Sequence, residues 1–124
     1  MKATETLLRK INEAFARNNR EFILEHVTDD ITWDAVGYQD IIRGKEEFER
    51  VLKEMDAPCE MDLQISNIVV QGTSAAVDGT ILVKNELKKD KKYAFCDIYK
   101  LKGEKDPKIC EMISYVINIS KQRK

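Results

Sequence analysis

Hydrophobic residues in the first half of the chain recur every three to four positions in three separate segments. This spacing predicts amphipathic helices over residues 4–18, 20–28 and 45–55. The third helix should end before Pro58, since a proline does not continue helical structure. Between the last two helices, residues 31–36 alternate in the manner of a short strand.

The second half of the chain follows a two-residue alternation with β-branched residues, which predicts strands. The strands are expected at residues 61–70, 75–85, 93–101 and 109–119, separated by turn residues. Because consecutive strands usually pair as neighbours, we expect an antiparallel sheet that curls, with the three helices on its concave side. The fold class is α+β, and such a curved sheet forms a cone with an open end.

Composition limits the classes of function. At 124 residues the chain has the size of one domain, residues 1–124, with one core. Lys and Arg number 21 and Asp and Glu 22, a balance that favours neither nucleic acid nor an anionic membrane as a partner. The sequence shows no apolar run of about 18 residues and no signal-peptide pattern, so a cytoplasmic protein is expected.

The cysteines point to neither a disulfide framework nor a metal site. Cys59, Cys96 and Cys110 are odd in number and lack C-x-x-C spacing. The single histidine, His26, lies late in the second expected helix, where a surface position is favoured. We therefore expect reduced thiols and no metal. The sequence also has no Gly-rich phosphate loop, H-E-x-x-H helix or nucleophile elbow, so no cofactor is expected.

The candidate chemistry centres on one acid within the alternating run 93–101. Phe95, Asp97, Tyr99 and Leu101 share one face of this strand, since successive side chains point to opposite sides. If that face looks inward, desolvation raises the pKa of Asp97, which would then donate a hydrogen bond at neutral pH. The alternative is a structural acid tied to a nearby hydroxyl.

The element order α-α-β-α-β-β-β-β, together with the local patterns at residues 28–33, 43–48, 95–99 and 108–112, resembles the nuclear transport factor 2-like superfamily. That superfamily includes ketosteroid isomerase, limonene epoxide hydrolase, scytalone dehydratase and the polyketide cyclases. The resemblance covers nearly the whole chain and implies a cystatin-like roll. It does not specify a function, since one fold supports many chemistries.

Comparison with ketosteroid isomerase suggests individual roles. Asp97 matches the carboxylic acid of its oxyanion hole, whereas the position of its oxyanion-hole tyrosine is Ile11 here. Its general base matches either Asp34 or Ala35, depending on a one-residue gap. A base at Asp34 beside an acid at Asp97 would suit proton abstraction next to a carbonyl. In the alternative, Trp33 faces the pocket and Asp34 faces water.

The alternation also predicts the wall of a pocket for a small apolar or partly polar molecule. Its members share the inward parity of their strands or helix: Trp33, Phe48, Val77, Ile81, Val83, Tyr99, Met112, Ser114 and Val116. Tyr38 is expected at the rim. The competing interpretation is an ordinary packed core without a cavity.

The last expected strand is apolar on both sides, and in this superfamily the outer sheet face commonly forms a homodimer. The residues expected there are Cys96, Ile98, Cys110, Ile113, Tyr115 and Ile117. Two functions remain open at this point. The first is an isomerase, cyclase or hydrolase that uses carboxylate acid-base chemistry, and the second is a non-catalytic ligand-binding or protein-interaction module.

Overall fold

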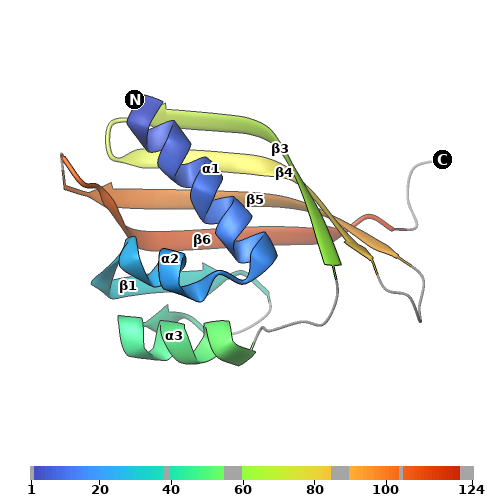
Figure 1. Ribbon diagram of the computed structural model, residues 1–124, viewed down its shortest axis with the longest axis horizontal. Coiled ribbons are helices and arrows are strands. Elements are labelled where there is room, and N and C mark those ends of the chain that lie inside the picture. The colour runs from blue at the N-terminus through green and yellow to red at the C-terminus, as the bar shows by residue number, and fades with distance from the viewer. Residues whose placement is uncertain (1, 38–39, 55–59, 85–89, 104, 121–124) are drawn as a thin grey trace.

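The computed structural model describes residues 2–37, 40–54, 60–84, 90–103 and 105–120. Three helices and six strands make up the fold (Figure 1). The helices are α1 (Lys2–Arg17), α2 (Arg20–Glu25) and α3 (Lys45–Glu54). The strands are β1 (Val27–Ala35), β2 (Ile42–Arg43), β3 (Glu60–Gln71), β4 (Ser74–Lys84), β5 (Lys91–Lys102) and β6 (Lys108–Asn118).

The two N-terminal helices form close to where their amphipathic pattern predicts them, although α2 is shorter than expected. Leu8 and Ile11 on one face of α1 are fully buried against the sheet. Asn18 takes a left-handed conformation at φ 56°, which asparagine tolerates and which ends α1. Asn19 then caps α2 by accepting the backbone N–H of Phe22 at 3.3 Å. The chain therefore turns sharply and returns toward the sheet.

The six strands form one curved sheet in the order β2-β1-β6-β5-β4-β3. The α+β class with three helices and a curved sheet is confirmed, with one refinement to the strand directions. Strands β3 to β6 pair antiparallel in sequence order, but β1 pairs with β6 in the parallel direction, so the sheet is mixed. Parallel strands need a long connection, and here β2, α3, β3, β4 and β5 all lie in the chain between β1 and β6.

The start of the sheet differs from the sequence prediction. Strand β1 begins at Val27, not at Ile31, and α2 ends correspondingly early at Glu25. The backbone N–H of Ile109 donates to the carbonyl of His26 at 2.8 Å, which brings this segment into the ladder. The residues that follow Val27 are polar, so the start of this strand lacks the apolar alternation by which a strand is predicted. The short strand β2 lies between the expected strand at 31–36 and the expected helix at 45–55, and it pairs Ile42 with Trp33.

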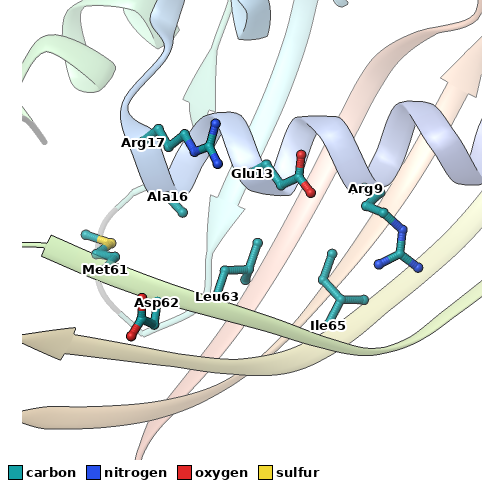
Figure 2. Close-up of a pocket in the computed structure, with 8 residues that line it drawn as sticks. All are labelled: Arg9, Glu13, Ala16, Arg17, Met61, Asp62, Leu63 and Ile65. Carbon is teal, nitrogen blue, oxygen red and sulfur yellow. The ribbon is translucent and has the colours of Figure 1, made fainter.

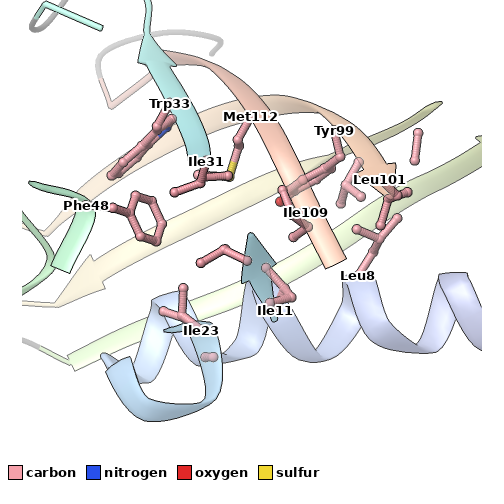
Figure 3. Packing of buried hydrophobic residues seen from close by; sticks show 14 of the residues in the cluster. Leu8, Ile11, Ile23, Ile31, Trp33, Phe48, Tyr99, Leu101, Ile109 and Met112 are labelled. Carbon is pink, nitrogen blue, oxygen red and sulfur yellow. The ribbon is translucent and has the colours of Figure 1, made fainter. Parts of the chain in front are cut away.

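All three helices lie over one face of the sheet (Figure 1). Between them is a core in which side chains of α1 meet side chains of the sheet, as Leu8 and Ile11 do near Ile109 and Tyr99 in Figure 3. Tyr99 is fully buried. A large side chain buried in this way contributes about 2–3 kcal/mol to the free energy of unfolding. None of the described helices has the length and apolarity needed to cross a bilayer.

Aromatic side chains fix the position of Trp33 within this core. Its ring lies 5.8 Å from the Phe15 ring of α1 and 5.5 Å from the Phe48 ring of α3, centroid to centroid, and the second contact is edge-to-face. Both distances are in the range of favourable aromatic pairs. The indole of β1 is therefore held between two helices.

A β-bulge interrupts the pairing of β3 with β4 between Ile65 and Asn67. Gly79 lies opposite the bulge, and a Cβ at this position would overlap with the carbonyl oxygen of Gln64. The bulge bends the strand toward the helices, and such bends are typical of strongly curved sheets. Glycine is required here by the close approach of two backbones.

Candidate functional site

Asp97 lies on the helix-covered inner face of β5, near the centre of the sheet. Its neighbours across the ladder are Val77 on β4 and Ser114 on β6, both buried. Paired residues in an antiparallel ladder point to the same side, so all three side chains face inward. The carboxyl is thus placed among apolar and hydroxyl groups, as the alternation of residues 93–101 predicts.

One set of hydrogen bonds reaches Asp97 from α1. The Tyr99 hydroxyl donates to Asp97 Oδ2 at 3.3 Å. The Asn12 side-chain amide, on α1, donates to the Tyr99 hydroxyl at 3.2 Å and to the carbonyl of Leu8 at 2.8 Å. Asn12 is buried although it is polar. Helix α1 is therefore connected to the acid through a buried amide and a buried phenol.

A second set of hydrogen bonds reaches Asp97 from β1. The Ser114 hydroxyl forms a hydrogen bond with the carboxyl. The Trp33 indole N–H donates to Ser114 Oγ at 3.0 Å. We call these five side chains the Asp97 network: Asn12, Tyr99, Asp97, Ser114 and Trp33.

Exposure differs sharply within the Asp97 network. Its four supporting side chains are at most 8 % exposed, and Tyr99 is at 0 %. Asp97 itself is only partly buried. The network is therefore anchored in the core, and Asp97 is its one member with partial exposure.

Burial raises the pKa of the Asp97 carboxyl to about 6, and the hydrogen bonds from Ser114 and Tyr99 oppose this rise. The cause is desolvation, which disfavours the charged form of an acid. The direction is the one expected from sequence, but at pH 7 a pKa of about 6 leaves the carboxyl mostly ionised. The same burial, followed by the charge of Asp97, raises the pKa of Tyr99 well above its ordinary value, so its proton stays in place.

Asn12 was not singled out in the sequence, although a signal exists. It lies four positions after Leu8 and three before Phe15, on the apolar face of α1. An amide among helix residues that pack inward must find hydrogen-bond partners. Periodicity alone does not indicate that Tyr99 is that partner, because the two residues are 87 positions apart.

The structure does not bring Asp34 together with Asp97. Asp34 pairs with Ile113, whereas Trp33 and Ala35 pair with Met112 and Ser114. The Asp34 side chain therefore projects from the opposite face of the sheet, since parity alternates along each strand. Of the two alternatives for the general-base position, Ala35 is the one on the inner face.

The residues predicted to line a pocket fall into two groups. Those that are at most 8 % exposed contribute to the packed interior: Trp33, Phe48, Val77, Tyr99, Met112 and Ser114. Those that stay partly exposed on the inner face are Ile81, Val83 and Val116. Val116 lies on β6 two residues after Ser114, the partner of Asp97. Val83 lies on β4 about 20 Å from Val77, the other partner of Asp97. Tyr38 lies outside the described residues.

Two surface cavities lie away from Asp97. One, of about 290 Å³, runs between α1 and the edge strand β3 (Figure 2). It places Arg9, Glu13 and Arg17 over Leu63 and Ile65. The other, of about 460 Å³, is open to solvent. Its lining residues come from the first two turns of α1, the end of α2, and the segment around the start of β6: Ala3, Leu7, Glu25, His26, Lys105, Asp106, Pro107 and Lys108.

Within the described parts of the chain, no three His, Cys, Asp or Glu side chains are grouped closely enough to hold a metal ion. The acid-base group at the inner face is thus the carboxyl of Asp97, supported by two hydroxyls. Such a group can accept a hydrogen bond when ionised and donate one when protonated.

Several solved structures share this architecture. A protein of Shewanella denitrificans classed as a SnoaL-like polyketide cyclase superposes with a TM-score of 0.80 at 11% identity, over 94% of this chain and 92% of that chain. A ketosteroid isomerase-like protein of Erwinia carotovora gives 0.70 at 17% identity, over 91% and 92%. An LEH-like epoxide hydrolase of M. tuberculosis gives 0.72 at 15% identity, over 90% and 80%. These likenesses show the fold.

No curated protein matches the sequence. A family model does match: residues 8–112 fit the model described as a SnoaL-like domain. This match spans most of the chain and confirms the resemblance to the nuclear transport factor 2-like superfamily. The chain belongs to the SnoaL-like domain family.

Proposed function

We propose that this protein binds a small, largely apolar molecule against the inner face of its sheet, with Asp97 as the polar contact. The observation that carries the proposal is the Asp97 network. Four buried side chains hold one acidic residue, Asp97, that is itself only partly buried. Buried polar networks are costly unless fully satisfied, and Asp97 is the member of this one with partial exposure. Ligand sites in proteins combine such polar points with apolar walls.

The chemistry that suits this site is proton transfer. A group with a pKa of about 6 is an effective general base near neutral pH and becomes an acid after it accepts a proton. We therefore place the protein among enzymes of the isomerase, cyclase or hydrolase kind, acting through Asp97. The polyketide cyclase, ketosteroid isomerase-like and epoxide hydrolase descriptions of its structural neighbours support this class.

A second candidate is a non-catalytic ligand-binding or interaction module. It is favoured by the position of Asp34, which projects from the face opposite Asp97, and by the alanine at position 35 on the inner face. Because Asp34 projects from the opposite face, proton abstraction and return would both use Asp97. The two candidates differ in whether the bound molecule is converted.

The test is a thermal-shift screen of a small-metabolite library against the wild type, Asp97→Ala and Asp34→Ala. A ligand that binds only the folded state raises the melting temperature by mass action. We expect hits that are lost in Asp97→Ala and kept in Asp34→Ala, and each hit is then incubated with protein and analysed for conversion. Conversion supports the enzyme, and binding without conversion supports the module. A library without hits would contradict both.

We further propose that the outer sheet face forms a homodimer. Ile117 and Tyr115 on β6 are 64 % and 44 % exposed, and they extend an apolar surface with Ile98 and Ile113. In analytical ultracentrifugation, Ile117→Glu should shift the protein to the monomer. Thr6→Glu, at an exposed position on α1 on the helix-covered side of the sheet, should remain dimeric. A wild type that sediments as a monomer at all concentrations would contradict the dimer.

A further inference from the structure

The hydrogen bonds of the Asp97 network have a fixed direction. At one end stands the indole N–H of Trp33, which can only donate. At the other end stands the amide nitrogen of Asn12. Its orientation is determined by Leu8, whose carbonyl oxygen can only accept and lies 2.8 Å from the same nitrogen. Both ends of the network are therefore obligate donors.

These donors determine what the two hydroxyls do. Ser114 accepts from Trp33, and Tyr99 accepts from Asn12. Each hydroxyl has one proton, and both direct it at Asp97. Hydrogen bonds that all run toward a carboxyl favour its ionised form, which only accepts. The network is arranged around a carboxylate.

This carboxylate has no cationic partner within the described chain. No Lys or Arg forms an ion pair with Asp97, and desolvation is the leading influence on its pKa. The described groups that face Asp97 are Val77 from β4, Ser114 from β6 and, through Tyr99, Asn12 from α1, and Val77, Ser114 and Asn12 do not titrate in the physiological range. Tyr99 is the titratable group in contact, and it is protonated.

The other titratable groups nearby are directed away from this site. Cys96, next to Asp97 in sequence, pairs with Asp78 on β4, and both side chains project from the opposite face of the sheet. Asp78 accepts a hydrogen bond from Asn67 on β3 at 2.9 Å. Among the described residues, no second charged group thus influences the pKa of Asp97 directly.

We propose that the ligand of this site is an organic cation, an ammonium group attached to an apolar body, whose charge pairs with Asp97. The inference rests on the binding site proposed above and names its ligand class. An ammonium supplies the countercharge that the carboxylate lacks and further hydrogen-bond donors beside the two hydroxyls, and a buried charge is stable only when it is paired. The apolar body has Val116 beside the acid and Ile81 farther along β4 as partly exposed contacts on the same face.

The state of Asp97 at neutral pH favours a cation over a neutral carbonyl compound. With a pKa of about 6, about one molecule in ten carries the protonated acid at pH 7. A carbonyl that needs the proton would lose roughly tenfold in apparent affinity, since only the competent fraction binds. A cation binds the form that is already present.

The experiment uses matched probes and NMR. Phenethylamine, 2-cyclohexylethylamine and butylamine are each compared with the alcohol and the methyl ketone of the same carbon skeleton. Binding is followed by the ¹³C signal of the Asp97 carboxyl between pH 5 and pH 8. We expect at least one amine to bind more tightly than its neutral analogues. Its affinity should rise about tenfold from pH 5 to pH 7, as the ionised fraction does.

Two variants define the contact. Asp97→Asn keeps the shape and removes the charge, and it should abolish the preference for amines. Asp78→Asn makes the same change on the outer face of the adjacent strand and should leave amine binding unaltered.

Three results would overturn the inference. Tighter binding of an alcohol or ketone than of its amine would exclude a cationic ligand but leave the proposed site in place. Amine affinity that is independent of pH, or that survives in Asp97→Asn, would exclude the charge pair. If no probe of either series perturbs the Asp97 signal, the binding site itself is contradicted together with the ligand class.

Discussion

Ser114 lies directly opposite Asp97 in the β5–β6 ladder and links its carboxyl to the indole of Trp33. Its hydroxyl accepts from the indole at 3.0 Å, and its hydrogen bond with the carboxyl lowers the pKa of the acid. One small side chain thus satisfies a buried donor of β1 and stabilises a charge on β5. Both effects can be tested by its removal.

Ser114→Ala should raise the pKa of Asp97 above its value of about 6, because the carboxylate loses a donor that lowers it. The indole N–H of Trp33 is left unpaired in the core, which should lower the free energy of unfolding by about 1–3 kcal/mol. NMR titration of the Asp97 carboxyl and urea unfolding measure the two effects. Ser66→Ala, at an exposed position in β3, is the control. An unchanged pKa of Asp97 would show that Ser114 does not donate to it.

Asn12→Asp keeps the shape of the side chain but replaces a donor with an acceptor. The Tyr99 hydroxyl can then serve only one of two carboxylates, and a second buried charge is unpaired. We expect a loss of about 3 kcal/mol or more in the free energy of unfolding at pH 7. The deficit relative to wild type should shrink at pH 5, where the new acid is protonated more readily in the folded than in the unfolded state.

The matched control for this change is Asn19→Asp at the N-cap of α2. Aspartate caps helices as well as asparagine, so its stability should stay within about 0.5 kcal/mol of wild type. Urea unfolding at the two pH values compares the variants. Equal stability of Asn12→Asp and wild type at pH 7 would contradict the role of Asn12 as a donor.

Asp97→Asn should change how stability depends on pH. The folded-state pKa of about 6 lies above the ordinary aspartate pKa of 3.8, so between these values the folded protein holds a proton that the unfolded chain has released. Stability contributed by this proton is complete below about pH 4 and is lost as pH rises to 6, by at most about 3 kcal/mol. The variant lacks this titration.

Unfolding free energies at pH 4, 5, 6 and 7 should therefore show Asp97→Asn gaining on the wild type as pH rises. Asp78→Asn, which changes a carboxyl on the outer face, should follow the wild-type profile in this window. Parallel profiles for wild type and Asp97→Asn would mean that the Asp97 pKa is not raised in the folded protein.

Gly79→Ala should destabilise the protein by at least the 1–3 kcal/mol typical of overpacking, because the new Cβ meets the backbone carbonyl of Gln64 at the bulge. Gly72→Ala is the control. It places a methyl group in open space at a φ of 58° and should cost only about 1 kcal/mol. Urea midpoints rank the two variants. A smaller loss for Gly79→Ala than for Gly72→Ala would show that the bulge relaxes.

The sequence by itself determined the local elements. Apolar spacing gave the helical segments that became α1 and α3, and two-residue alternation gave strands β3 to β6 with the correct inward parity of Asp97 and Tyr99. These features depend on residues only a few positions apart, which a periodic pattern records. Strand β2 and the early start of β1 were not recognised, because a two-residue strand and a polar start carry no such pattern.

The tertiary structure alone decided how these elements form a site. The parallel register of β1 on β6 placed Ala35 beside Ser114 and directed Asp34 to the opposite face. It also brought the Trp33 indole to Ser114 across 81 positions of sequence. Packing of α1 on the sheet brought Asn12 to Tyr99 in the same way. Contacts between distant segments depend on register and packing of whole elements, and no local periodicity encodes them.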